Sequence, residues 1–306
     1  MAAAPSKIPP PSTRRGDPNV AVILTWFLPG AGHLYLGRGL WALAVFGVVE
    51  GIYALGLWLS DGMAFEYLDA ELRSALAPVL SPEAGNLGAF LWQLRRFGFG
   101  PEPWYPRPFP PYIGLGSMLT ALSGVLNIVA MVHAHVLARM PATLPRAPHA
   151  TSVPASARPA LAVGLAWLVP GLGHLYQGRR LRALLVLVTL VGLFALGTLL
   201  AHGSNLSRER HFYYWAGQFL LGLPALASEL IVGDAPVAGE LPLVEVGLVF
   251  ACVAGMLNVL AMIDVFGWQE AELFGLPKRG EERAAAEGGG AQGSRTSPGA
   301  GEGEAA

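Results

Sequence analysis

The stretch that decides the fold occurs twice in this chain. Residues 26–38 read WFLPGAGHLYLGR, and residues 167–179 read WLVPGLGHLYQGR. Both copies lie inside long apolar stretches, and each contains a Pro-Gly pair of the kind that ends a helix. We interpret this pattern as a duplicated, membrane-embedded unit.

The composition also predicts a membrane protein. The 306 residues are 53% hydrophobic and 13% charged, with a mean hydropathy of +0.46, whereas about a quarter of a soluble chain is charged. The net charge of −1 provides no basic field, so no nucleic-acid partner is expected. The single cysteine, Cys252, excludes an intrachain disulfide. The expected partners are the lipid bilayer and membrane proteins or further copies of this chain.

Several segments are predicted to be membrane helices. Four are long and apolar enough to cross a hydrocarbon core of about 30 Å: 40–59, 112–132, 183–201 and 243–263. Two shorter stretches, 19–36 and 160–177, are predicted to be first helices that end near the Pro-Gly pair and turn back through a Gly-rich loop. The fold class expected is therefore an all-α polytopic membrane protein with three spans in each of two tandem repeats.

Five parts of the chain are expected. They are a polar N-terminal tail (1–18), membrane repeat 1 (19–139), a Pro/Ala-rich linker (140–159), membrane repeat 2 (160–276) and a disordered C-terminal tail (277–306). The regions 60–111 and 202–241 are less apolar. Within the second, the aromatic residues of 211–232 favour an interfacial or re-entrant helix, and a further span is the alternative.

The repeats match again in their last helices, where residues 124–131 read GVLNIVAM and residues 255–262 read GMLNVLAM. Small residues four apart form one helical stripe that ends at an asparagine and a methionine. Its members are Gly116, Thr120, Gly124, Asn127 and Met131 in repeat 1, and Gly247, Ala251, Gly255, Asn258 and Met262 in repeat 2. Such stripes let helices approach closely in lipid, and asparagine can bond across the contact. We interpret the stripe as a packing surface, with a ligand role as the alternative.

An odd number of spans per repeat predicts that the second repeat is inverted relative to the first. In that topology, 14 Lys and Arg residues lie on the side of the two termini and 6 lie on the other. The positive-inside rule then places both termini in the cytoplasm. The expected location is the bacterial inner membrane.

The Pro-Gly-x-Gly-His hairpin resembles the two-transmembrane-helix hairpin domain of many bacterial and animal membrane proteins. The fuller pattern is similar to a bacterial membrane protein family of unknown function, in which a later helix reads Glu-x-Gly…Ala-Gly-x-Leu-Asn…Asp. Repeat 2 fits this pattern from Glu245 to Asp264, whereas repeat 1 has His133 where Asp264 stands. The resemblance implies a membrane location and a helical hairpin, and it carries no activity and no cofactor.

Each repeat has a candidate polar cluster. The members are His33, Tyr35, Arg38, Asn127 and His133 in repeat 1, and His174, Tyr176, Arg179, Asn258 and Asp264 in repeat 2. These side chains either satisfy the carbonyls that a Pro-Gly break leaves free or include histidines that act as ligands or proton carriers. His174 is expected to lie closer to Asp264 than to His33. A metal site of His33, His133 and His135 is disfavoured because His133 and His135 point to different helix faces.

Two acids fall inside the predicted spans, and buried acids in membranes are often functional. Glu50 is central in its span, whereas Glu245 lies near a helix end. The sequence has no P-loop, dinucleotide fingerprint or His-Glu-x-x-His motif, so no catalytic residue, metal or cofactor is predicted. Three functions are left open: a structural or assembly role, a small-solute or lipid transporter built on an inverted repeat, and an intramembrane enzyme.

Overall fold

The computed structural model describes residues 14–63, 77–95, 108–141, 153–233 and 242–277, and within these ranges it contains helices and no strands. Four helices are long and apolar enough, by length and composition, to cross a membrane. They are α3 (Gly39–Leu59), α6 (Ile113–Arg139), α9 (Arg180–Leu200) and α12 (Val244–Phe274). The prediction of an all-α helical membrane protein is therefore confirmed.

In each repeat the two long helices are antiparallel. The end of α3 meets the start of α6: the Cα of Gly56 lies against the backbone of Gly116. The start of α3 meets the end of α6, where the rings of Trp41 and His133 lie 5.0 Å apart between centroids. Helices α9 and α12 repeat this arrangement. The first long helix of each repeat thus starts on the face where the second long helix ends.

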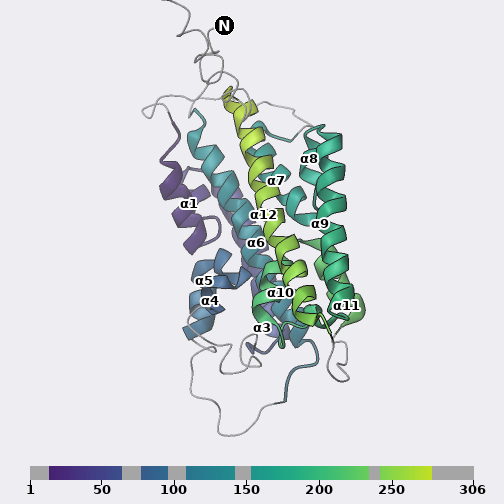
Figure 1. The fold of residues 1–306 in the computed structure, drawn as a ribbon. Helices are drawn as coiled ribbons and strands as arrows, with labels where there is room; N and C mark the ends of the chain where they lie inside the picture. Colours follow the sequence, from purple (N-terminus) through teal and green to yellow (C-terminus); the bar gives the residue numbers. More distant parts are fainter. Residues whose placement is uncertain (1–13, 64–76, 96–107, 142–152, 234–241, 278–306) are drawn as a thin grey trace, which may run out of the picture.

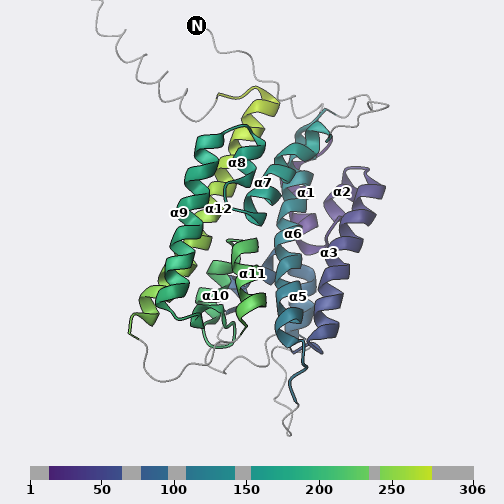
Figure 2. The ribbon, with the colours of Figure 1, turned by 90° about the vertical axis from the view of Figure 1, so that its right-hand side faces the viewer.

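The two repeats point in the same direction. Arg139 at the end of α6 forms an ion pair with Glu270 at the end of α12, and Met140 packs in one apolar cluster with Phe274. We call this side the first face, and the side where α3 and α9 end the second face (Figures 1 and 2). The predicted inversion is wrong, because each repeat has an even number of full spans.

The predicted first spans are re-entrant hairpins. Helix α1 (Pro18–Phe27) starts at the first face and has 10 residues, which is about 15 Å of helix and half of a hydrocarbon core. After the break, α2 (Ala31–Tyr35) runs back toward the same face. Repeat 2 has the same hairpin in α7 (Arg158–Leu168), preceded by the short η4 (Ala155–Ala157), and α8 (Leu172–Tyr176). The expectation of three spans in each repeat is therefore corrected to two spans and one hairpin.

The Pro-Gly pair makes this hairpin through backbone conformation and close packing. Gly30 has φ +85° and Gly171 has φ +86°, a region that L side chains rarely adopt. A Cβ on either glycine would also clash with a carbonyl of the following long helix, that of Ala42 or of Ala183. Each turn therefore packs directly on the next span of its own repeat.

Short helices enter from the second face and meet these hairpins. Repeat 1 supplies α4 (Ala77–Leu80), η2 (Pro82–Gly85) and α5 (Leu87–Gln93), and repeat 2 supplies η5 (Ser204–Leu206), α10 (Phe212–Phe219) and α11 (Leu223–Val232). Figure 1 shows α1 above α5, and Figure 2 shows α7 above α10 and α11. The backbone of Gly88 lies against the Phe27 carbonyl, and that of Gly222 against the Trp167 carbonyl. Two half-helices thus fill the third position of each repeat, and 211–232 is divided between α10 and α11 and does not form one long helix.

Candidate functional site: the polar clusters of the two repeats

Asn127 lies where the half-helices of repeat 1 meet. Its Nδ2 donates to the carbonyl of Thr25 at 2.8 Å and to that of Gly85 at 3.0 Å. The Thr25 carbonyl belongs to the last turn of α1, where no intrahelical donor remains. Gly85 is the last residue of η2 and lies two residues before the start of α5. One buried amide therefore holds together segments that arrive from opposite faces.

Asn258 makes the same connection in repeat 2. Its Nδ2 donates to the carbonyl of Ala166, in the last turn of α7, at 3.2 Å, and to that of Leu220, just before α11, at 3.0 Å. Both asparagines are fully buried. The duplicated asparagine thus satisfies carbonyls that lipid could not satisfy.

The histidines form separate sites closer to the first face. His33 is fully buried, and its Nε2 lies 3.0 Å from Nδ1 of His133. In repeat 2, Nε2 of His174 lies 3.2 Å from Oδ2 of Asp264. The structure thus pairs each hairpin histidine with the last long helix of its own repeat. It does not join either histidine to the asparagine of that repeat by any described hydrogen bond.

Arginines distinguish the second cluster from the first. Asp264 accepts ion pairs from Nη2 of Arg179 at 2.8 Å and from Nη1 of Arg182 at 3.1 Å. The Arg179 guanidinium also lies 4.4 Å from the ring centroid of Trp268. Repeat 1 has His133 at the corresponding position, so its cluster contains no carboxylate among the described residues.

This difference affects the pKa values of the hairpin histidines. Burial lowers the pKa of His33 to about 4. Burial also lowers the pKa of His174, but the hydrogen bond and the charge of Asp264 act in the opposite direction. Two nearly identical hairpins therefore hold their histidines in different electrostatic environments.

The remaining predicted residues have separate positions. The hydroxyl of Tyr35 accepts a hydrogen bond from the backbone N–H of Asp17 at 3.2 Å, and Tyr176 is largely exposed. Glu50 lies in α3 and accepts a hydrogen bond from Nδ2 of Asn86 at 3.1 Å. Glu245 is exposed in the first turn of α12, where the helix dipole favours an acid. None of these four joins a histidine cluster within the described contacts.

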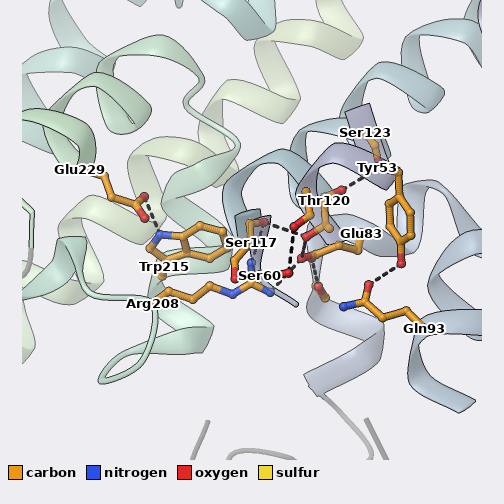
Figure 3. Close-up of polar contacts among 12 residues, drawn as sticks. Tyr53, Ser60, Glu83, Gln93, Ser117, Thr120, Ser123, Arg208, Trp215 and Glu229 are labelled. Atoms are coloured by element: carbon orange, nitrogen blue, oxygen red, sulfur yellow. Dashed lines mark hydrogen bonds and ion pairs between the residues drawn. The ribbon is translucent and has the colours of Figure 1, made fainter. Parts of the chain in front are cut away.

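An ion pair that sequence reasoning missed joins the two repeats near the second face. Nη2 of Arg208 lies 2.8 Å from Oε1 of Glu83, and their side chains are 4% and 0% exposed. Glu83 also accepts hydrogen bonds from the hydroxyls of Thr120, at 3.0 Å, and Ser81. Figure 3 shows the guanidinium between this carboxylate and the ring of Trp215. A buried charge pair with this many partners is a junction between the repeats.

The only sequence signal for this junction was that each repeat has a less apolar region that contains charged residues. Glu83 and Arg208 lie 125 residues apart in the chain, one in each of these regions. The indole N–H of Trp215 donates to Oε2 of Glu229 at 2.8 Å, which adds a second acid on the repeat 2 side. No local spacing links these residues, because tertiary packing alone brings them together.

No group of three or more His, Cys, Asp or Glu side chains that could hold a metal ion occurs in the described part of the chain. His33 and His133 are paired, whereas His135 lies 3.6 Å from Glu270. The three histidines of the disfavoured metal site are thus divided between two contacts.

Comparison with models of protein families identifies the family of this chain. One family model matches the chain twice, over residues 20–144 and 161–276, once in each repeat. The chain belongs to DUF6677, a family of unknown function. The double match means that the DUF6677 unit comprises a re-entrant hairpin, two long helices and the short helices between them. No curated protein and no solved structure matches the chain.

Proposed function

We propose that this protein has a structural or assembly role in the membrane and performs no catalysis. The observation that supports this role is the use of the duplicated polar residues. Asn127 and Asn258 bond to backbone carbonyls at the half-helix junctions, and the hairpin histidines bond to side chains of their own repeats. These side chains stabilise an interrupted helical bundle, which is what a scaffold requires.

The proposed location is the bacterial inner membrane, with both termini in the cytoplasm. Eight of the described arginines lie at the first face, namely Arg14, Arg15, Arg38, Arg139, Arg158, Arg179, Arg180 and Arg182. The other three, Arg95, Arg208 and Arg210, follow α5 and η5 toward the second face. This asymmetry supports a cytoplasmic first face by the positive-inside rule.

Crosslinking in native membranes tests the assembly role. A photoreactive amino acid placed at Leu181 or Leu199, which are exposed on α9, is expected to capture one defined membrane protein or a second copy in stoichiometric yield. A matched probe at Leu190, which is buried, is expected to capture neither. Capture limited to lipid at every exposed position would contradict the proposal.

A transporter is the second candidate, and Glu50 is the observation in its favour. This acid lies within a long helix beside Asn86 at the α1–α5 junction, and broken helices with intramembrane acids occur in transporters. Proteoliposomes containing the purified chain distinguish the two roles. Ion or solute flux above that of protein-free vesicles, abolished by Glu50→Gln, would replace the structural proposal.

A further inference from the structure

The duplicated hairpin allows the charges of one repeat to be compared with those of the other. By the spacing of the motif, Arg38 corresponds to Arg179 and His133 corresponds to Asp264. In repeat 2 the Asp264 carboxylate receives Arg179, Arg182 and His174, at distances from 2.8 to 3.2 Å. In repeat 2 an internal anion therefore pairs with these basic groups.

Repeat 1 has basic groups without this anion. Neither Arg15 nor Arg38 has an ion pair among the described residues, and the buried Nε atom of each lacks a hydrogen-bond partner there. Gly16, the residue after Arg15, lies against the side chains of Tyr35 and Leu36, and Arg38 follows Leu36 by two residues. The neighbouring stretches 1–13 and 142–152 contain no Asp or Glu. The first hairpin thus concentrates positive charge that no ion pair within the described ranges balances.

The two arginines are held in place by the fold. The backbone N–H of Arg15 donates to the Met140 carbonyl at 3.1 Å, and its Nη2 donates to the Pro141 carbonyl at 3.5 Å. Arg38 follows the α2 turn, and its N–H donates to the His33 carbonyl at 2.8 Å. Asp17, the nearest acid in sequence, caps α1, where its Oδ1 accepts the N–H of Asn19 at 2.7 Å, and it forms no ion pair with either arginine among the described contacts. The backbone of each arginine and the side chain of Arg15 are therefore fixed, and both residues are partly exposed, so an anion can approach them.

We propose that Arg15 and Arg38 bind a phosphate group, which supplies in repeat 1 the negative charge that Asp264 supplies in repeat 2. Guanidinium groups bind phosphate through paired N–H donors, so two of them form a suitable site. The phosphate of an anionic lipid is the favoured source. Leu40, Trp41 and Tyr35 beside the site are 80%, 46% and 46% exposed, and aromatic side chains with basic residues are typical of the headgroup region.

Native mass spectrometry of the full-length chain in detergent tests the site with dioleoylphosphatidylglycerol. The apparent affinity for the first bound lipid is expected to fall about fivefold in Arg38→Gln or Arg15→Gln, since one basic residue near a membrane surface contributes about that factor. Arg179→Gln is the matched control, because Asp264 already balances that arginine, and it is expected to bind lipid like the wild type.

Exchanging the residue that differs between the repeats gives a second test. His133→Asp places a carboxylate in the first cluster and is expected to abolish the site, whereas Asp264→Asn is expected to add a second bound lipid in repeat 2. Inorganic phosphate in a thermal-shift assay separates the two sources of the anion. A stabilisation by phosphate that Arg38→Gln removes assigns the site to free phosphate, and lipid binding that phosphate does not compete assigns it to a lipid.

The variants of Arg15 and Arg38 keep the proposal falsifiable if His133→Asp does not fold. Equal lipid binding and equal phosphate stabilisation in the wild type, Arg38→Gln and Arg179→Gln would overturn it. An Asp264→Asn protein that binds the same number of lipids as the wild type would also overturn it. That result would show that removing the internal carboxylate does not create a binding site.

Discussion

Asn127 and Asn258 show how one residue type solves the same problem twice. A helix that stops inside a membrane leaves carbonyls without donors, and each asparagine supplies two hydrogen bonds from a single amide nitrogen. A side chain that is apolar at this position would leave both carbonyls unpaired.

Asn258→Leu is therefore expected to lower the free energy of unfolding by about 1–3 kcal/mol, the cost of leaving buried polar groups unsatisfied. Denaturation with SDS in mixed micelles measures this change. Asn127→Leu is expected to have a similar effect, because the contacts are the same. Leu260→Ala, at a side chain that is 61% exposed on the same helix, is the control. An Asn258→Leu protein as stable as that control would show that the hydrogen bonds of Asn258 do not stabilise the junction.

The His174–Asp264 pair predicts a pH response. Burial lowers the pKa of His174 and Asp264 opposes that shift, so Asp264→Asn is expected to lower the His174 pKa further and to leave His33 unchanged. NMR of isotopically labelled histidine in micelles measures both values.

The sign of the stability change follows from linkage. A histidine whose pKa is lower in the folded state loses stability as the pH falls below its unfolded value of 6.5. Asp264→Asn should therefore increase the loss of melting temperature between about pH 7.5 and about pH 5. An identical pH dependence in the variant and the wild type would contradict the role of Asp264.

At the scale of elements, the small-residue stripe is the surface on which other helices pack. A Cβ on Gly124 would clash with the Pro82 carbonyl of η2, and a Cβ on Gly255 would clash with the Gly217 carbonyl of α10. Gly124 and Gly255 therefore receive the short helices, while Gly116 and Gly247, at the start of the stripe, receive the long helices α3 and α9.

Gly255→Leu is expected to force α10 away from α12 and to lower the free energy of unfolding by about 1–3 kcal/mol, if overpacking costs here what it costs in soluble cores. Thermal unfolding in detergent checks the effect. Gly267→Leu provides a control on the same helix, because a Cβ on Gly267 meets no atom within 4 Å. Equal melting temperatures for the two variants would argue against close packing at Gly255.

At the scale of the whole molecule, the parallel repeats predict a topology that cysteine labelling can test. With Cys252 replaced by serine, single cysteines at the exposed positions Ala155 and Glu272 should react from one side, and a cysteine at Glu209 should react from the other. In the orientation proposed above from the positive-inside rule, the first side is expected to be the cytoplasmic one. An inverted repeat would instead place Ala155 with Glu209, opposite Glu272.

The Glu83–Arg208 ion pair predicts that the repeats are energetically coupled. Arg208→Met leaves a fully buried carboxylate without its cation and is expected to cost about 3–5 kcal/mol. The double variant with Glu83→Gln should recover much of that loss, because the unpaired charge is gone. A double-mutant cycle by SDS denaturation measures the coupling, and additive losses would mean that the pair does not join the repeats.

Much of this protein was determined by the sequence alone. The repeated WFLPGAGHLYLGR and WLVPGLGHLYQGR stretches predicted the duplication and the helix break in each copy, because a Pro-Gly pair interrupts a helix. Apolar length predicted the four long helices, and the spacing of small residues predicted the packing stripe. These are local properties, encoded within one or two helical turns.

Only the tertiary structure decided the depth of the hairpins and the direction of the repeats. Whether residues 19–36 cross the membrane or return depends on what meets them at the middle, and that partner, the segment around Gly85 and Gly88, comes from a distant part of the chain. The pairing of Glu83 with Arg208 depends on the same assembly. Changing one span to a re-entrant hairpin reverses the orientation of everything that follows it, so local pattern could not determine that orientation.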